Sequence, residues 1–178
     1  MAKVLFIVSG ASYWVLKDGT RHATGYWAEE FANPYKILTD AGHEVVVATP
    51  NGAIPTVDMM SLRPEMVGGN DNALELEAII RSAEVMRRPL QLSDVRLEDY
   101  DAVYMPGGHG PMSDLAWDAD VGRLLTKQLT SGHPLFIGVN FSRGPMWRPY
   151  MVEDRNLVTG QNPASAAVLG NRMLEILK

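Results

Sequence analysis

Residues 101–112 read Asp-Ala-Val-Tyr-Met-Pro-Gly-Gly-His-Gly-Pro-Met, an apolar run that ends in a glycine-rich turn. A second apolar run, Pro-Leu-Phe-Ile-Gly-Val, occupies residues 134–139. Short runs of this kind are typical of strands that are covered on both faces of a sheet. These two stretches therefore predict two buried strands of a parallel sheet.

The rest of the chain alternates between predicted strands and predicted helices. Further strands are expected at residues 3–9 and 43–48, a hairpin around Asp154-Arg155, and helices at residues 26–41, 74–86, 114–131 and 162–177. Strands that alternate with helices indicate a mostly parallel sheet between two helical layers, a three-layer α/β/α sandwich. The sequence shows no internal repeat and no linker, so residues 1–178 are expected to form one domain.

Composition excludes several classes of function. The net charge of −5 disfavours nucleic-acid binding, and no apolar run has the length of a membrane span. The first residues enter a strand pattern without the features of a signal peptide, so a cytoplasmic location is expected. The 178 residues contain no cysteine, which excludes disulfides and thiolate metal ligands.

The carboxyl ends of the parallel strands define where a ligand is expected, because α/β sheets bind ligands at that edge. Gly107 and Gly108 follow the 102–105 strand and can direct backbone N–H groups at an anion or a developing oxyanion. A plain strand-to-helix turn is the alternative interpretation of these glycines. Ser9-Gly10 and residues 139–141 are expected at the same crevice.

Glu30 is the candidate acid or base. It lies three residues after Trp27 and four before Pro34, beside the apolar stripe of its predicted helix. A carboxyl in that place is expected to be partly desolvated, which raises its pKa and suits proton transfer. A solvated surface glutamate is the alternative.

Three other polar side chains are weighed as site residues. His109 in the glycine turn and His22 in the first long loop can face the crevice, but with Glu30 they show no recognised zinc spacing, so no metal is predicted. Ser142 follows a strand as a nucleophile would, but Pro145 and Pro149 interrupt the helix that a nucleophile elbow requires. Ser142 therefore stays an alternative nucleophile.

Several motifs in this order resemble the ThiJ/PfpI superfamily, and most closely its heat-shock-induced glyoxalase III and chaperone branch. They extend over most of the chain: Thr-Gly-Tyr-Trp-Ala-Glu-Glu-Phe-Ala-Asn-Pro-Tyr at 24–35, Pro-Asn-Gly at 50–52, Pro55-Val57-Asp58, Met-Pro-Gly-Gly-His-Gly at 105–110, Trp-Arg-Pro-Tyr at 147–150 and Asn-Leu-Val-Thr-Gly-Gln-Asn-Pro-Ala-Ser at 156–165. The resemblance implies a flavodoxin-like fold, no cofactor and a homodimer. It also implies action on 2-oxoaldehydes such as methylglyoxal, as a glyoxalase III or a deglycase, or a holdase chaperone role.

The resemblance assigns Glu30 as the acidic partner of a cysteine nucleophile, and Gly107 and Gly108 as backbone donors. This chain departs from the family where that nucleophile belongs. The family continues after Gly138-Val139 with Cys-His-Gly-Pro, a helix and further strands, whereas this chain has Asn140 and then reaches the family's tail motif within a few residues. A missing segment, with its junction near residues 139–142, fits this pattern. The other alignment sets residues 142–145, Ser-Arg-Gly-Pro, against Cys-His-Gly-Pro.

Loss of that segment has two expected consequences. Without a thiolate the family reaction has no nucleophile, so thiol-dependent activity is expected to be absent or very small. One face of the sheet is expected to lose a covering helix, and the exposed apolar surface favours a homodimer or a partner protein. The hypotheses are thus an inactive or very weak glyoxalase-type protein, a non-catalytic chaperone-like or partner-binding module, and a hydrolase that uses Ser142 or a water between Glu30 and His109.

Overall fold

The computed structural model describes residues 1–138 and 148–178. Its seven-stranded sheet has the order β5-β4-β1-β6-β7-β9-β8, and every neighbouring pair is parallel except β8 and β9. The strands are β1 (Lys3–Ile7), β4 (Glu44–Thr49), β5 (Leu90–Gln91), β6 (Ala102–Met105), β7 (Leu135–Gly138), β8 (Met151–Asp154) and β9 (Leu157–Gly160). The predicted three-layer α/β sandwich is confirmed.

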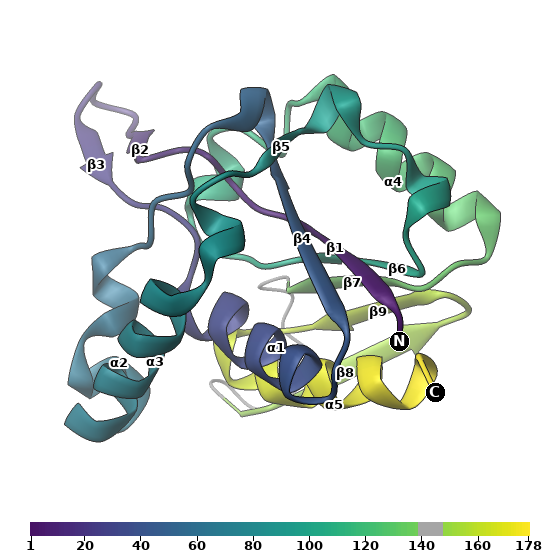
Figure 1. Ribbon diagram of the computed structural model, residues 1–178. Coiled ribbons are helices and arrows are strands. Elements are labelled where there is room, and N and C mark those ends of the chain that lie inside the picture. Colours follow the sequence, from purple (N-terminus) through teal and green to yellow (C-terminus); the bar gives the residue numbers. More distant parts are fainter. Residues whose placement is uncertain (139–147) are drawn as a thin grey trace.

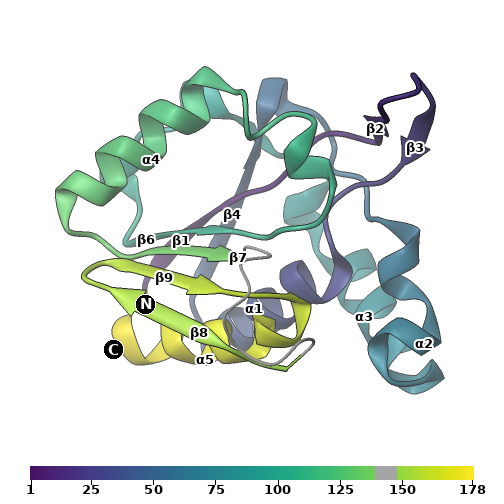
Figure 2. The same cartoon turned by 180° about the vertical axis from the view of Figure 1, so that it is seen from behind.

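Helices cover both faces of this sheet (Figures 1 and 2). Helices α1 (Ala28–Asp40) and α5 (Ala166–Ile176) pack together on one face, and α4 (Ala119–Ser131) lies on the other. Helix α3 (Asn70–Ser82) lies beside α1, and the short α2 (Pro64–Val67) packs against α3. Within the described part of the chain, every helix falls short of the length and apolar character that a membrane span requires.

The apolar strands of the centre supply both halves of the core. Side chains alternate between the two faces of a strand. In β1, Val4 and Phe6 join the cluster under α1 and α5, while Leu5 and Ile7 join the cluster under α4, and all four are fully buried. This explains why the run at residues 3–9 has no polar face.

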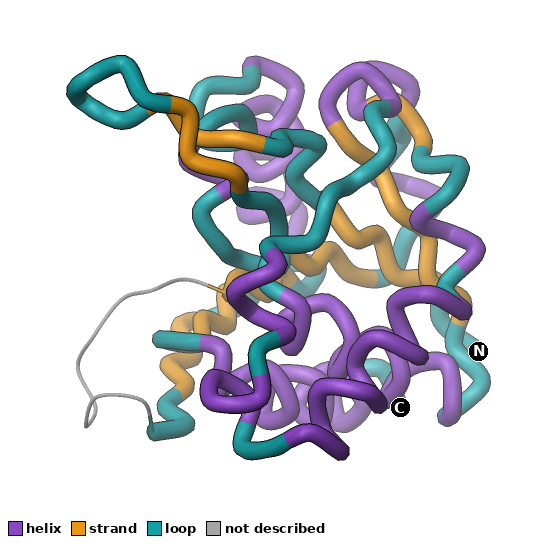
Figure 3. The backbone as a smooth tube through the Cα atoms, turned by 90° about the vertical axis from the view of Figure 1, so that its left-hand side faces the viewer, coloured by secondary structure: helices purple, strands orange, loops and turns teal. Residues whose placement is uncertain are grey.

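The structure differs from the sequence prediction at two places near the strand ends. The predicted loop at residues 10–25 contains a hairpin of β2 (Tyr13–Val15) and β3 (Arg21–Ala23), which projects from the rest of the molecule in Figure 3. Helix α4 begins at Ala119 rather than at Asp114, because Asp118 caps it by accepting from the backbone N–H groups of Asp120 and Val121.

Asp114 connects two of the loops at the strand ends. Its carboxylate accepts hydrogen bonds from Ser9 Oγ at 2.8 Å and from the backbone N–H groups of Gly10 and Ala11 at 2.8 and 3.0 Å. These bonds fix the loop that follows β1 against the loop that follows β6. The two loops whose proximity the sequence predicted are therefore held together by a residue that was assigned to a helix.

Candidate functional site

Glu30 lies in the first turn of α1, and its side chain reaches the carboxyl ends of β6 and β7. The residue is only 5% exposed, and its Oε2 atom accepts a hydrogen bond from the Gly107 N–H at 2.6 Å. Burial raises the pKa of Glu30 to about 7, although the Gly107 N–H opposes the shift. The predicted desolvation is confirmed, and a carboxyl of this kind can donate or accept a proton near neutral pH.

Two glycines make room for this carboxyl. A Cβ atom on Gly107 would stand 2.7 Å from Glu30 Oε2, and one on Gly138 would overlap the same oxygen. The Tyr104 hydroxyl donates to the Glu30 backbone oxygen at 2.5 Å and fixes the start of α1 against β6. The ends of two strands and the first turn of one helix therefore fit together only with glycine at both positions.

The structure modifies the role expected of the glycine turn. The Gly107 N–H already donates to Glu30, so in this state it is occupied by the carboxyl and does not face a substrate oxygen. Gly108 has a φ of 117°, which favours glycine, and it forms an isolated bridge with Tyr26. Part of this turn thus serves to hold Glu30.

His109 lies within the glycine turn and contacts three other side chains. Its Nδ1 atom lies 3.5 Å from Asp58 Oδ2, and its ring stacks on Trp14 at 6.0 Å between centroids and meets Trp27 edge to face at 6.4 Å. Asp58 is buried, and it also accepts from Thr24 Oγ1 at 2.8 Å. The side chain of His109 remains 43% exposed, so the imidazole is positioned by the protein and open on one side.

A cavity of about 870 Å³ brings the candidate residues together. Glu30, Gly107, Gly108 and His109 all line it. Most of the remaining wall is apolar: Met105 and Ile137 line it from the sheet, Val121 and Leu125 from α4, and Leu115 from the turn before α4. The site therefore combines a buried acid, an oriented imidazole and a long apolar wall.

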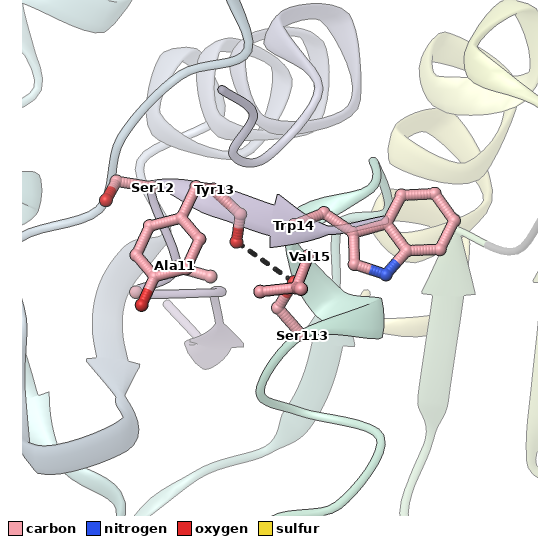
Figure 4. A pocket seen from close by; sticks show the side chains of 7 residues that line it. Ala11, Ser12, Tyr13, Trp14, Val15 and Ser113 are labelled. Carbon is pink, nitrogen blue, oxygen red and sulfur yellow. Dashed lines mark hydrogen bonds between the residues drawn. The ribbon is translucent and has the colours of Figure 1, made fainter. Parts of the chain in front are cut away.

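A smaller cavity of about 410 Å³ lies beside the β2–β3 hairpin (Figure 4). Its lining residues include Gly10, Tyr13 and Ser113, and Ser113 Oγ donates to the Tyr13 backbone oxygen at 3.1 Å. Figure 4 shows the Trp14 indole extending away from the Tyr13 ring, and Trp14 also lines the larger cavity. The smaller cavity has no Asp, Glu, His, Lys or Arg among its described lining residues, and we assign it no chemistry.

The remaining predicted residues do not add to this site. Asn140 and Ser142 lie outside the described residues. His22 lies in β3 opposite Trp14 and does not line the large cavity. Among residues 1–138 and 148–178 no three His, Cys, Asp or Glu side chains are grouped as a metal site would require.

Asp58 and the two tryptophans are site residues whose contacts with His109 the sequence did not reveal. Asp58 belongs to a recognisable motif, but it is 51 residues from His109, and no local pattern links the two. Trp27 is buried, and its indole N–H has no acceptor in hydrogen-bond geometry among the described residues, although it lies near enough to Glu29 to influence that carboxyl.

Comparisons with known proteins agree with this fold. Residues 22–131 match the family described as ThiJ/PfpI family-like. The protein/nucleic acid deglycase HchA of Staphylococcus aureus (strain bovine RF122 / ET3-1) is 29% identical over 129 residues, which are 69% of this chain and 42% of the deglycase. The chain thus spans about two fifths of the length of the curated relatives that it matches.

Solved structures extend the similarity of fold to nearly the whole chain. Glyoxalase III from Candida albicans superposes with a TM-score of 0.81 at 18% identity, over 98% of this chain and 96% of that one. Rapid Encystment Protein 24 kDa from Francisella tularensis gives 0.79 at 19% identity and covers both chains fully. Because the family match covers more than half of the sequence and the fold agrees with it, this chain belongs to the ThiJ/PfpI family.

Proposed function

We propose that this chain is a thiol-free relative of the glyoxalase III and deglycase enzymes, which binds a carbonyl compound and turns over 2-oxoaldehydes very weakly or not at all. The observation that carries the proposal is Glu30, a buried carboxyl with a pKa of about 7 on the wall of a large cavity, in a sequence without cysteine. The deglycase relative and the glyoxalase III neighbour indicate the class of compound.

The chemistry of the residues supports binding of a carbonyl compound without efficient turnover. A protonated Glu30 can donate a hydrogen bond to a carbonyl oxygen, and its ionised form can accept a proton from an adjacent carbon. Neither form replaces a thiolate, which would add covalently to the aldehyde carbon. An asparagine amide at position 140 is not a nucleophile of this kind, and Ser142 as a hydrolytic nucleophile remains a separate hypothesis.

The test is the formation of lactate from methylglyoxal by the purified chain, with Glu30→Ala as the matched variant. We expect the rate with the unmodified chain to equal the rate with Glu30→Ala and with buffer. Lactate formation that depends on Glu30 would refute the proposal. Formation that persists in Glu30→Ala but disappears in Ser142→Ala would instead assign the nucleophile of this reaction to Ser142.

A partner-binding or chaperone-like role is the second candidate, and exposed apolar side chains favour it. Trp117 is 84% exposed in the turn before α4, and Ile54, Met59 and Met112 also face solvent. Trp117 and Met112 are neighbours, because the Trp117 indole N–H donates to the Met112 backbone oxygen at 3.2 Å, and contiguous exposed apolar patches mark surfaces that bind other proteins. This role is supported if the unmodified chain suppresses the thermal aggregation of a client protein and the Trp117→Ser variant does not. Equal suppression by the unmodified chain and by Trp117→Ser would show that Trp117 takes no part in client binding.

A further inference from the structure

The cavity beside Glu30 is much larger than the substrate that the family suggests. A water molecule occupies about 30 Å³ in the liquid, so a 2-oxoaldehyde of five heavy atoms fills on the order of 150 Å³. The cavity has a volume of about 870 Å³, which lies within the range of pockets that hold ligands of drug size. Methylglyoxal alone would leave most of this space to water against an apolar wall.

The wall under α4 is apolar, and part of its side-chain surface faces the cavity without contacting other protein atoms. Met105 and Ile137 project from neighbouring strands on the α4 side of the sheet, and Leu125 faces them from α4. All three are only partly buried, whereas the side chains deeper in the same layer are covered. Met60 and Met112 stand elsewhere on the wall, and methionine adapts to ligands of varied shape.

The polar groups lie at the other end of the cavity, at the strand tips. Glu30 and His109 can each present a hydrogen-bond donor there, and Trp27 contributes a buried indole N–H without an acceptor in hydrogen-bond geometry. The described lining residues include Glu30 and Asp118 but no Lys or Arg. The carboxyls of Glu30 and Asp118 disfavour an anionic ligand, so the described part of the lining favours a neutral ligand that accepts hydrogen bonds.

We propose that this cavity binds a neutral, mainly apolar molecule with one carbonyl group, such as a medium-chain ketone or aldehyde. The carbonyl oxygen lies at the Glu30 and His109 end, and the hydrocarbon chain extends beneath α4 along Met105, Ile137 and Leu125. The inference rests on the proposed function, since it specifies the carbonyl compound of the same site.

The test uses methyl ketones, which do not react with lysine as aldehydes do. Titration calorimetry of the full chain at pH 7 with acetone, 2-pentanone, 2-heptanone and 2-nonanone should show affinity rising about fourfold for each added methylene, as burial of a CH₂ predicts. Nonanoate, of the same length but anionic, should bind at least tenfold more weakly than 2-nonanone. A flat ketone series, or tighter binding of nonanoate, would overturn the inference.

Two variants on the same helix locate the binding. Leu125→Trp fills the cavity and should weaken 2-nonanone at least tenfold, whereas Leu129→Trp, one turn later and outside the cavity lining, should stay within twofold. If Leu125→Trp fails to fold, Ile137→Phe narrows the cavity from the sheet side. Equal affinity in both tryptophan variants would refute the location. Ketone binding and lactate formation are separate readouts, so failure of this inference is distinguishable from failure of the proposed function.

Discussion

Replacing Glu30 by glutamine should stabilise the protein, and the gain should grow as the pH rises. Burial raises the pKa of Glu30 from an ordinary 4.5 to about 7 in the folded chain. Between these two values the folded protein holds a proton that the unfolded chain releases. The stability from this proton is complete below pH 4.5 and is lost as the pH rises through 7.

The size of the effect follows from the two pKa values. One pKa unit corresponds to about 1.4 kcal/mol. Ionisation of Glu30 in the folded chain at pH 8 therefore removes about 3 kcal/mol from the free energy of unfolding, compared with the value below pH 4.5. Glutamine keeps a side-chain oxygen for the Gly107 N–H and carries no charge. The stability of Glu30→Gln relative to the unmodified chain should therefore increase by about 2–3 kcal/mol between pH 5 and pH 8.

Urea unfolding at pH 5, 6, 7 and 8, followed by tryptophan fluorescence, measures this difference. Glu29→Gln removes the same formal charge from the neighbouring position. Burial raises the pKa of Glu29 as well, but Glu29 is less buried than Glu30, so its pH-dependent gain should be smaller. A difference between Glu30→Gln and the unmodified chain that stays constant with pH, or shrinks, would show that Glu30 is not held in a desolvated site.

Two further outcomes follow from the packing and from the sheet. Gly138→Ala should lower the free energy of unfolding by about 1–3 kcal/mol, because the added Cβ overlaps the Glu30 carboxyl. Gly122→Ala in α4 should raise the free energy of unfolding by about 0.5–1 kcal/mol, because a Cβ there meets nothing within 4 Å. Equal melting temperatures of the two variants would contradict this expectation. We also predict a homodimer that forms through the α4 side of β8, where Val152 is 47% exposed. Light scattering should give a mass of twice the 19.6 kDa of one chain, and Val152→Glu should reduce the measured mass to that of one chain. A monomeric mass for the unmodified chain would refute the dimer.

The sheet was predictable from sequence because its signals are local. The runs at residues 4–8 and 102–105 are apolar at every position, since both faces of these strands are covered, whereas the burial of Glu30 was one of two alternatives that its place beside Trp27 left open. The predicted start of α4 was wrong because the Asp114 carboxylate accepts hydrogen bonds from Ser9 and Gly10 in the loop after β1, and Asp114 does not join the helix. The Asp58–His109 contact was not predictable, since it depends on how two loops 51 residues apart meet.

Glu30 links the stability of this chain to its proposed role. Its partners are the Gly107 N–H and the neighbouring acid Glu29, and no Lys or Arg forms an ion pair with it among the described residues. A glutamine would satisfy the same backbone donor at lower cost, so folding alone does not account for an acid here. Carboxyls whose pKa is raised by desolvation on a cavity wall are concentrated at functional sites. In a sequence without cysteine, the role that we propose for this acid is to donate a hydrogen bond to the oxygen of a neutral carbonyl compound, and only the protonated carboxyl can donate it.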